Sequence, residues 1–177
     1  MKNKKIILNF ANELNREMFD SKLSYGVEII SSEKMSIDYG TVKDGICEAN
    51  EKETKIIINS DTNVKLLRFV ICHELTHVAF RRGLSGFRAI KTFIEAVMPN
   101  VEELSNYVDI LGDAGLKEFK NNFYSCIDWL DKENIQTMNS VPFDMPESIL
   151  LAAEEAICNL VALEVETSKA IASSILQ

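Results

Sequence analysis

The feature that most constrains this chain is the run His73-Glu74-Leu75-Thr76-His77, in which two histidines four residues apart enclose a glutamate. Residues four apart lie on the same face of an α-helix, so two imidazoles at this spacing can reach one small cation. Glu74 lies about 100° further round the helix, where it can take a proton from a water bound to that cation. The run therefore predicts a metal site on a helix, with His73 and His77 as ligands and Glu74 as general base.

The residues around this run predict a strand followed by a buried helix. Lys55–Asn59 is an apolar, β-branched run, and Ser60 and Asp61 are favourable residues for a helix N-terminus. From Thr62 to Arg81 apolar residues cover most of the helix surface, which indicates burial. Buried polar groups without partners cost on the order of 2 to 7 kcal/mol each, and a metal ion would supply partners. The alternative is that the histidines are hydrogen-bonded core residues and Glu74 is a surface residue.

Composition and charge narrow the class of protein. A chain of 177 residues with 46% hydrophobic and 26% charged residues fits one globular domain. The formal net charge of −8 argues against direct binding of nucleic acid or of an anionic membrane, because both are bound by basic surfaces. No stretch approaches the roughly 18 to 20 apolar residues of a membrane span, and polar residues interrupt the N-terminal apolar run too early for a signal sequence. We therefore expect a cytoplasmic protein.

The cysteines predict neither a zinc ribbon nor a redox motif, because none of the four belongs to a C-x-x-C pair. In a cytoplasmic protein we expect them to be reduced and buried. They are Cys47, Cys72, Cys126 and Cys158.

Periodicity predicts an α+β fold: a small, mostly antiparallel sheet packed on the buried helix, and a mainly helical C-terminal half. We expect a single domain over residues 1–177, with an α/β part (1–82), a helical insertion (83–145) and a long helix (146–177). The expected strands are Tyr25–Ser31, a weaker one at Ser36–Tyr39, Gly45–Ala49 and Thr54–Asn59. The other expected helices are Lys5–Ser21, Phe87–Val97, Val101–Leu111, Leu116–Leu130 and Pro146–Ile175, with a loop at Asn134–Asp144.

A third metal ligand has to come from outside the histidine run. A catalytic zinc ion usually takes three protein ligands and leaves a fourth position for water. The chain has only two histidines, His73 and His77, so the third ligand cannot be a histidine. Glutamate, aspartate and cysteine remain.

The segment Glu155-Ala156-Ile157-Cys158-Asn159 resembles the Glu-x-x-x-Asp segment of thermolysin-like gluzincins, whose glutamate binds zinc. The resemblance implies that Glu155 is the third ligand and that Asn159 accepts a hydrogen bond from the free N–H of His73. Glu154 is the alternative ligand, about 100° round the helix. For either glutamate the other possibility is a solvated helix face, and Cys158 could also approach the site.

Lys55–Asn59 and Leu67–His77 together resemble the ImmA/IrrE family of metallopeptidases, in which a strand ending in Asn precedes an Arg-Phe pair and an H-E-x-x-H helix. This chain has Thr76 where the family usually has Gly. The resemblance implies a Zn²⁺ cofactor and a gluzincin-type endopeptidase. It also implies a protein substrate such as a transcriptional repressor of a phage or mobile element. The alternative is a catalytically silent zinc-binding regulatory or interaction protein with the same fold.

The implied mechanism uses His73, His77 and Glu155 to hold zinc, while Glu74 takes a proton from the attacking water and passes it to the leaving amine. Thermolysin has a histidine that stabilises the oxyanion, and this chain has none left for that role. A tyrosine could replace it, and the sequence does not select among Tyr25, Tyr107 and Tyr124.

Overall fold

The computed structural model describes residues 3–50, 52–83, 91, 93–97, 108–135 and 145–175 of the chain. The chain forms two compact units, one made of Met1–Arg82 with Glu164–Gln177 and the other of Gly83–Leu163. The boundary after Arg82 coincides with the predicted start of the helical insertion. The long helix α6 (Glu147–Ile175) contributes residues to both units. The expectation of a single domain stays a prediction.

A three-stranded sheet is the centre of the first unit. Its strands are β1 (Gly26–Ile30), β2 (Gly45–Ala49) and β3 (Thr54–Asn59). β3 lies in the middle and pairs in parallel with β1 and antiparallel with β2. The sheet is therefore mixed, whereas the sequence predicts a mostly antiparallel one. β3 takes the central position because its run of three isoleucines is the most apolar stretch of the three strands, and all three are fully buried.

Helix α2 (Ser32–Tyr39) lies where the sequence predicts a weak strand at Ser36–Tyr39, so that prediction was wrong. Local capping explains the helix: the Ser31 hydroxyl accepts a hydrogen bond from the Lys34 N–H (3.3 Å). At the other end Gly40 adopts φ 67° and donates its N–H to the Ser36 carbonyl. The segment that contains α2 connects β1 to β2, and these are the two edge strands of the sheet. The hairpin then returns β3 between them, which makes β3 parallel to β1.

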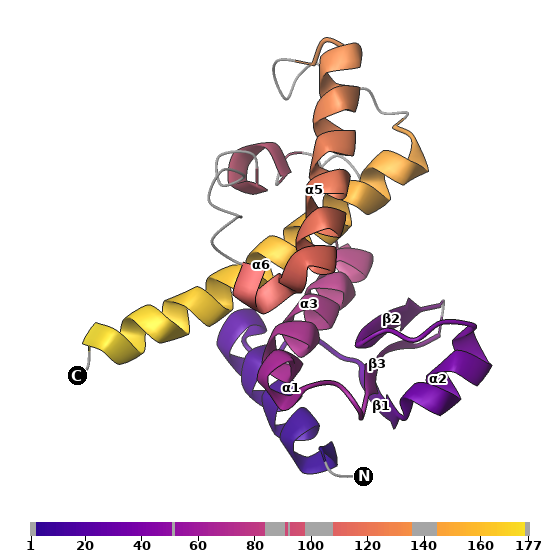
Figure 1. The fold of residues 1–177 in the computed structure, drawn as a ribbon, viewed down its shortest axis with the longest axis vertical. Coiled ribbons are helices and arrows are strands. Elements are labelled where there is room, and N and C mark those ends of the chain that lie inside the picture. The colour runs from indigo at the N-terminus through magenta and orange to yellow at the C-terminus, as the bar shows by residue number, and fades with distance from the viewer. Residues whose placement is uncertain are drawn as a thin grey trace. The chain divides into compact units, whose positions relative to one another are not determined.

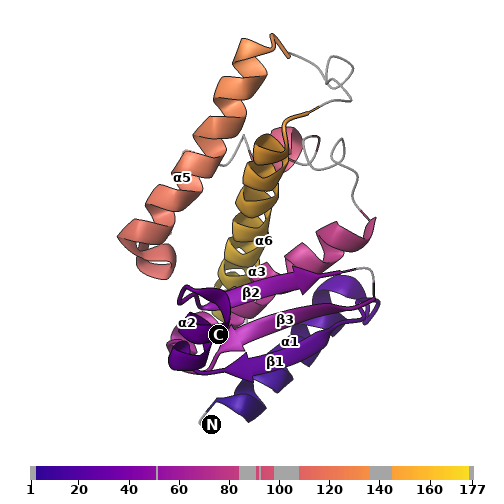
Figure 2. The same cartoon turned by 90° about the vertical axis from the view of Figure 1, so that its right-hand side faces the viewer.

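Helices cover both faces of this sheet. α1 (Lys4–Phe19) and α3 (Val64–Gly83) lie on one face, and α2 lies on the other (Figure 1; Figure 2). On the α2 side Ile30, Met35 and Ile57 form a buried cluster. Because side chains alternate along a strand, Ile56 and Ile58 point to the opposite face, toward α1 and α3. The fully buried residues of those two helices include Ile7, Leu14, Leu67, Ile71, Cys72, Leu75 and Val78.

The second unit is helical in its described residues. It contains the π-helix η1 (Phe93–Val97), α5 (Val108–Lys132) and the N-terminal part of α6. α5 is interrupted at Gly112 (φ 67°, ψ 170°), which agrees with a predicted break between helices at this place. The rings of Phe93 and Phe123 contribute to the core of this unit, with centroids 5.5 Å apart. Parts of three predicted segments lie outside the described residues: residues 87–90 and 92 of the helix Phe87–Val97, residues 101–107 of the helix Val101–Leu111, and residues 136–144 of the loop.

The α+β class predicted by the sequence is confirmed by this arrangement of a small sheet and a mainly helical C-terminal half. All four cysteines are buried, as the sequence predicts. That they are reduced stays a prediction. Across the described ranges, no helix combines the length and the apolar character needed to cross a membrane.

Candidate metal centre

His73 and His77 lie one turn apart on α3, with their Nε2 atoms 3.0 Å from each other. Their rings meet edge to face, with centroids 4.8 Å apart. His77 is buried and His73 half-buried. As a neutral pair, one ring donates its Nε2–H to the Nε2 lone pair of the other. In metal binding, both rings would offer their Nε2 lone pairs to the ion instead.

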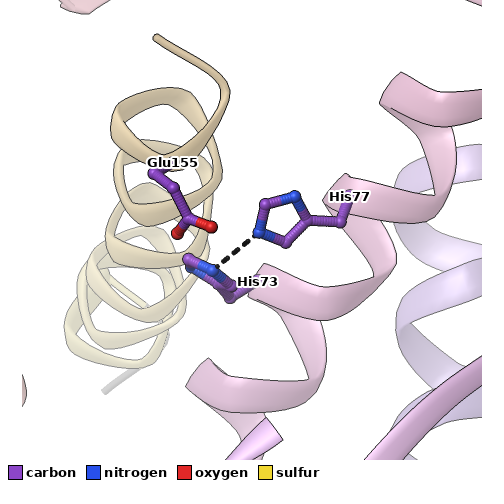
Figure 3. Close-up of side chains that lie close together, drawn as sticks. All are labelled: His73, His77 and Glu155. Carbon is purple, nitrogen blue, oxygen red and sulfur yellow. Dashed lines mark hydrogen bonds between the residues drawn. The ribbon is translucent and has the colours of Figure 1, made fainter. Parts of the chain in front are cut away.

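Glu155 on α6 completes a group of three possible metal ligands. One ligand atom from each of His73, His77 and Glu155 can be chosen so that all three lie within 4.8 Å of one another. Figure 3 shows the half-buried carboxylate of Glu155 directed toward the two rings. Glu154, the alternative in the sequence, is not part of this group in the described part of the chain.

The donor set of His73, His77 and Glu155 fits a zinc ion. Two imidazole nitrogens and one carboxylate oxygen are a ligand set of catalytic zinc sites, which keep a fourth position open. Two nitrogen ligands of tetrahedral zinc lie roughly 3.3 Å apart, and the two Nε2 atoms are 3.0 Å apart. If the Glu155 oxygen lies as much as 4.8 Å from a histidine nitrogen, it has to move by roughly 1.5 Å to reach the spacing of two zinc ligands. Rotation about the side-chain bonds of Glu155 provides such a movement. These three residues could therefore hold a metal ion.

Glu74 is buried where α3 faces β2, with only 6% of the residue exposed. A β-carbon built on Gly45, the first residue of β2, would lie 2.7 Å from Oε1 of Glu74 and 2.8 Å from its Cγ. The carboxylate of Glu74 thus lies directly against the backbone of β2. The sequence assigns no role to Gly45, although a glycine in a strand often indicates a close approach.

Asn59 joins the end of β3 to the segment that leads into β2. It is 3% exposed, and its side-chain amide donates to the Lys43 carbonyl (3.1 Å) and to the Ser32 hydroxyl (3.0 Å). Its backbone N–H donates to the Asp44 carbonyl (3.0 Å). These hydrogen bonds fix the residues before Gly45 to the centre of the sheet. The sequence identifies Asn59 only as the last residue of a strand.

Arg68 connects α3 to two other helices within the first unit. Its side chain is 8% exposed and forms ion pairs with Glu13 (3.0 Å) and Glu17 (3.1 Å) of α1. A third ion pair joins its Nε to Glu166 of α6 (3.4 Å). Arg68 belongs to the Arg-Phe pair of the family resemblance, which by itself names no partner for it. The structure therefore places Arg68 as a link between helices.

The remaining candidates from the sequence are the three tyrosines that could stabilise an oxyanion, and Asn159. The Tyr25 hydroxyl donates to the Ala11 carbonyl of α1 (3.0 Å), and burial raises the pKa of Tyr25. Tyr124 is exposed on α5. Tyr107 lies outside the described residues. Asn159 is half-buried on α6, and its role as an acceptor for His73 stays a prediction.

Thr76 and Cys158 lie close to the predicted ligands in the sequence. The Thr76 hydroxyl donates to the Cys72 carbonyl one turn earlier (2.8 Å), so this departure from the family pattern is accommodated within α3. Cys158 is fully buried, as expected of a small core residue.

Comparison with protein-family models, with curated proteins and with solved structures gives no match for this chain. The likeness to the ImmA/IrrE family therefore rests on the residues quoted from the sequence. That the metal is zinc and that the reaction is peptide hydrolysis are proposals.

Proposed function

We propose that this chain is a zinc-dependent endopeptidase in which His73, His77 and Glu155 hold the ion. The observation that carries the proposal is the grouping of these three ligand atoms within 4.8 Å of one another. Zinc, when bound, supplies a Lewis acid that lowers the pKa of water toward ~7 and polarises a carbonyl group.

Glu74 is the proposed general base. It follows the first ligand, His73, by one residue, which turns its side chain about 100° round α3 from that ligand. It takes the proton of the attacking water and delivers it to the amine of the departing peptide. A site that only stabilises a fold has no need of a carboxylate at this position, so the glutamate supports a catalytic site over a structural one.

The proposed substrate is a protein. The resemblance to the ImmA/IrrE family makes a transcriptional repressor of a phage or mobile element the first substrate class to test.

Substitution of the general base tests the proposal. Glu74→Gln should keep one zinc ion per chain and lower the cleavage rate by roughly 10²- to 10⁴-fold, the usual contribution of a general base. Zinc is measured by mass spectrometry, and cleavage with quenched fluorescent casein and candidate repressors. Glu154→Gln is the matched control, because it makes the same chemical change outside the ligand group. Cleavage by Glu74→Gln at the parent rate would remove Glu74 from the mechanism, and a wild-type chain without zinc would refute the whole proposal.

A second candidate is a catalytically silent zinc-binding protein that acts by binding a partner. The observation in its favour is that Gly83–Leu163 forms a compact unit of its own, which is much larger than the short segment around Glu155 that the metal site uses. Incubating the zinc-loaded chain with a candidate repressor separates the two functions. Co-elution of both intact proteins favours the binding protein, whereas fragments of the repressor favour the peptidase.

A further inference from the structure

We propose that Gly45 is a positioning residue for Glu74, because its missing side chain leaves the space that the Glu74 carboxylate occupies. The inference rests on the proposed function in so far as Glu74 is the general base. It assigns a role to a residue on β2 that the metal-binding run does not contain.

The space at Gly45 is filled by two side chains of α3. A β-carbon there would lie 2.7 Å from Glu74 Oε1, 2.8 Å from Glu74 Cγ and 2.8 Å from Val70 Cγ1. All three distances are shorter than the roughly 3.5 to 4.0 Å at which non-bonded carbon atoms attract each other most strongly. Val70 and Glu74 are four residues apart, so they lie on the same face of α3 and meet β2 together. Any side chain at Gly45 would therefore displace one or both of them.

The need for glycine at this position is steric and not conformational. Among the described glycines, positive φ angles occur at Gly40 and Gly112, and an added β-carbon at either would have nothing within 4 Å. Gly45 shows the reverse combination: an ordinary backbone conformation and a crowded β-carbon position. An alanine at Gly45 is thus acceptable to the backbone and unacceptable only to its neighbours on α3.

The strand is held too firmly to move away from an added side chain. Gly45 pairs with Ile58 in the antiparallel ladder between β2 and β3. Immediately before it, the Asp44 carbonyl accepts from the Asn59 N–H (3.0 Å), and the Asp44 carboxylate accepts from the Thr62 hydroxyl (2.7 Å). Because both sides of Gly45 are anchored to β3 and the loop after it, the displacement falls on the flexible side chain of Glu74.

Gly45→Ala tests this inference, with Gly26→Ala as the matched control. Gly26 begins the other edge strand, and its β-carbon would make only ordinary contacts, the nearest at 3.4 Å. Gly45→Ala should keep one zinc ion per chain and lower kcat on quenched fluorescent casein by roughly 10- to 100-fold, since a 1 Å displacement of a catalytic group can cost about 10²-fold. KM should stay within about twofold. Gly26→Ala should match the wild type in kcat and zinc content.

Shortening the acid distinguishes positioning from a general loss of structure. In a Glu74→Asp chain the 2.7 Å contact with Oε1 is removed and the 2.8 Å contact with Cγ remains, so adding Gly45→Ala should lower kcat by a smaller factor than it does in the wild type. The same fold-loss in both backgrounds would overturn the inference, as would wild-type kcat in Gly45→Ala. Should Gly45→Ala fail to fold, Gly45→Ala with Val70→Ala removes the aliphatic contact and leaves only the one with Glu74.

Thermal unfolding gives a readout that does not depend on activity. Gly45→Ala should lower Tm by roughly 2–10 °C, as overpacking of a buried site does in a chain of this size. In a Glu74→Ala chain, the decrease in Tm caused by Gly45→Ala should be smaller by about half or more. Equal losses in both chains would overturn the inference. A wild-type chain that binds no zinc or cleaves nothing contradicts the proposed function instead, and the Tm comparison then decides the role of Gly45 alone.

Discussion

The Nε2 atoms of His73 and His77 lie 3.0 Å apart, a separation that suits both a hydrogen bond between the rings and two ligands of one ion. Both possibilities place the two imidazoles on one face of α3. In the hydrogen-bonded pair one Nε2 lone pair accepts a hydrogen bond from the other ring, whereas in the metal site both Nε2 lone pairs bind the ion. A measurement of metal binding therefore distinguishes the two possibilities.

Removal of single ligands should separate the two possibilities. His77→Ala and Glu155→Ala should each weaken zinc binding by about 100-fold or more, a larger effect than the 10- to 100-fold typical of residues around a ligand. Glu154→Ala should bind zinc within about threefold of the wild type. Competition titration with a coloured chelator measures all three affinities. A loss with Glu154→Ala and none with Glu155→Ala would make Glu154 the third ligand.

Arg68→Met should destabilise the first unit by about 2–4 kcal/mol. Arg68 is buried and joined to Glu13, Glu17 and Glu166, and its removal leaves three carboxylates without their common cation. Urea unfolding followed by circular dichroism measures the change. Lys34→Met is the control, because it removes the exposed ion pair with Asp38 and should leave stability unchanged. Equal stability of the two variants would refute the role given to Arg68.

Asn59→Asp should cost about 2–3 kcal/mol although it changes almost no volume. The carboxylate cannot donate to the Lys43 carbonyl or the Ser32 hydroxyl, and it places a charged oxygen near the Lys43 carbonyl in a buried site. Asn63→Asp is the matched control, since Asn63 is exposed and its side chain accepts from the Lys65 N–H, which a carboxylate also does. Urea unfolding measures the stability of both variants, and equal midpoints for Asn59→Asp and Asn63→Asp would contradict the prediction.

Stability should fall at alkaline pH through Cys126. Burial raises the pKa of its thiol from 9.0 to about 12, so the folded chain holds this proton more tightly than the unfolded chain. Because its pKa is raised in the folded chain, the thiol contributes to the free energy of unfolding. This contribution is complete below pH 9 and is lost as the pH rises toward 12. By pH 10 the loss is about 1.4 kcal/mol. Urea unfolding of wild type and Cys126→Ala at pH 8 and pH 10 should show a smaller pH dependence in the variant, and equal dependence would contradict the prediction.

Local patterns were sufficient for much of the fold. The strands Gly45–Ala49 and Thr54–Asn59 lie where alternation and β-branching predict them. The ends of α3 and α6 lie within two residues of the predicted ends. The strand predicted at Ser36–Tyr39 was wrong, although Ser31 and Gly40 carry the signals of a helix start and stop. Short segments of this kind are decided by their caps, because four residues are too few to show a period.

The sequence by itself determined that two imidazoles share one face of a buried helix, because the spacing of His73 and His77 is a property of any α-helix. It also determined that no third histidine exists. The resemblance to gluzincins implies Glu155 as the third ligand, and only the tertiary structure groups it with the two histidines, since it is 78 positions beyond His77 in the sequence. The tertiary structure alone decided that Glu74 lies against Gly45. Such contacts between distant residues depend on strand order and helix packing, which no local pattern of residues encodes.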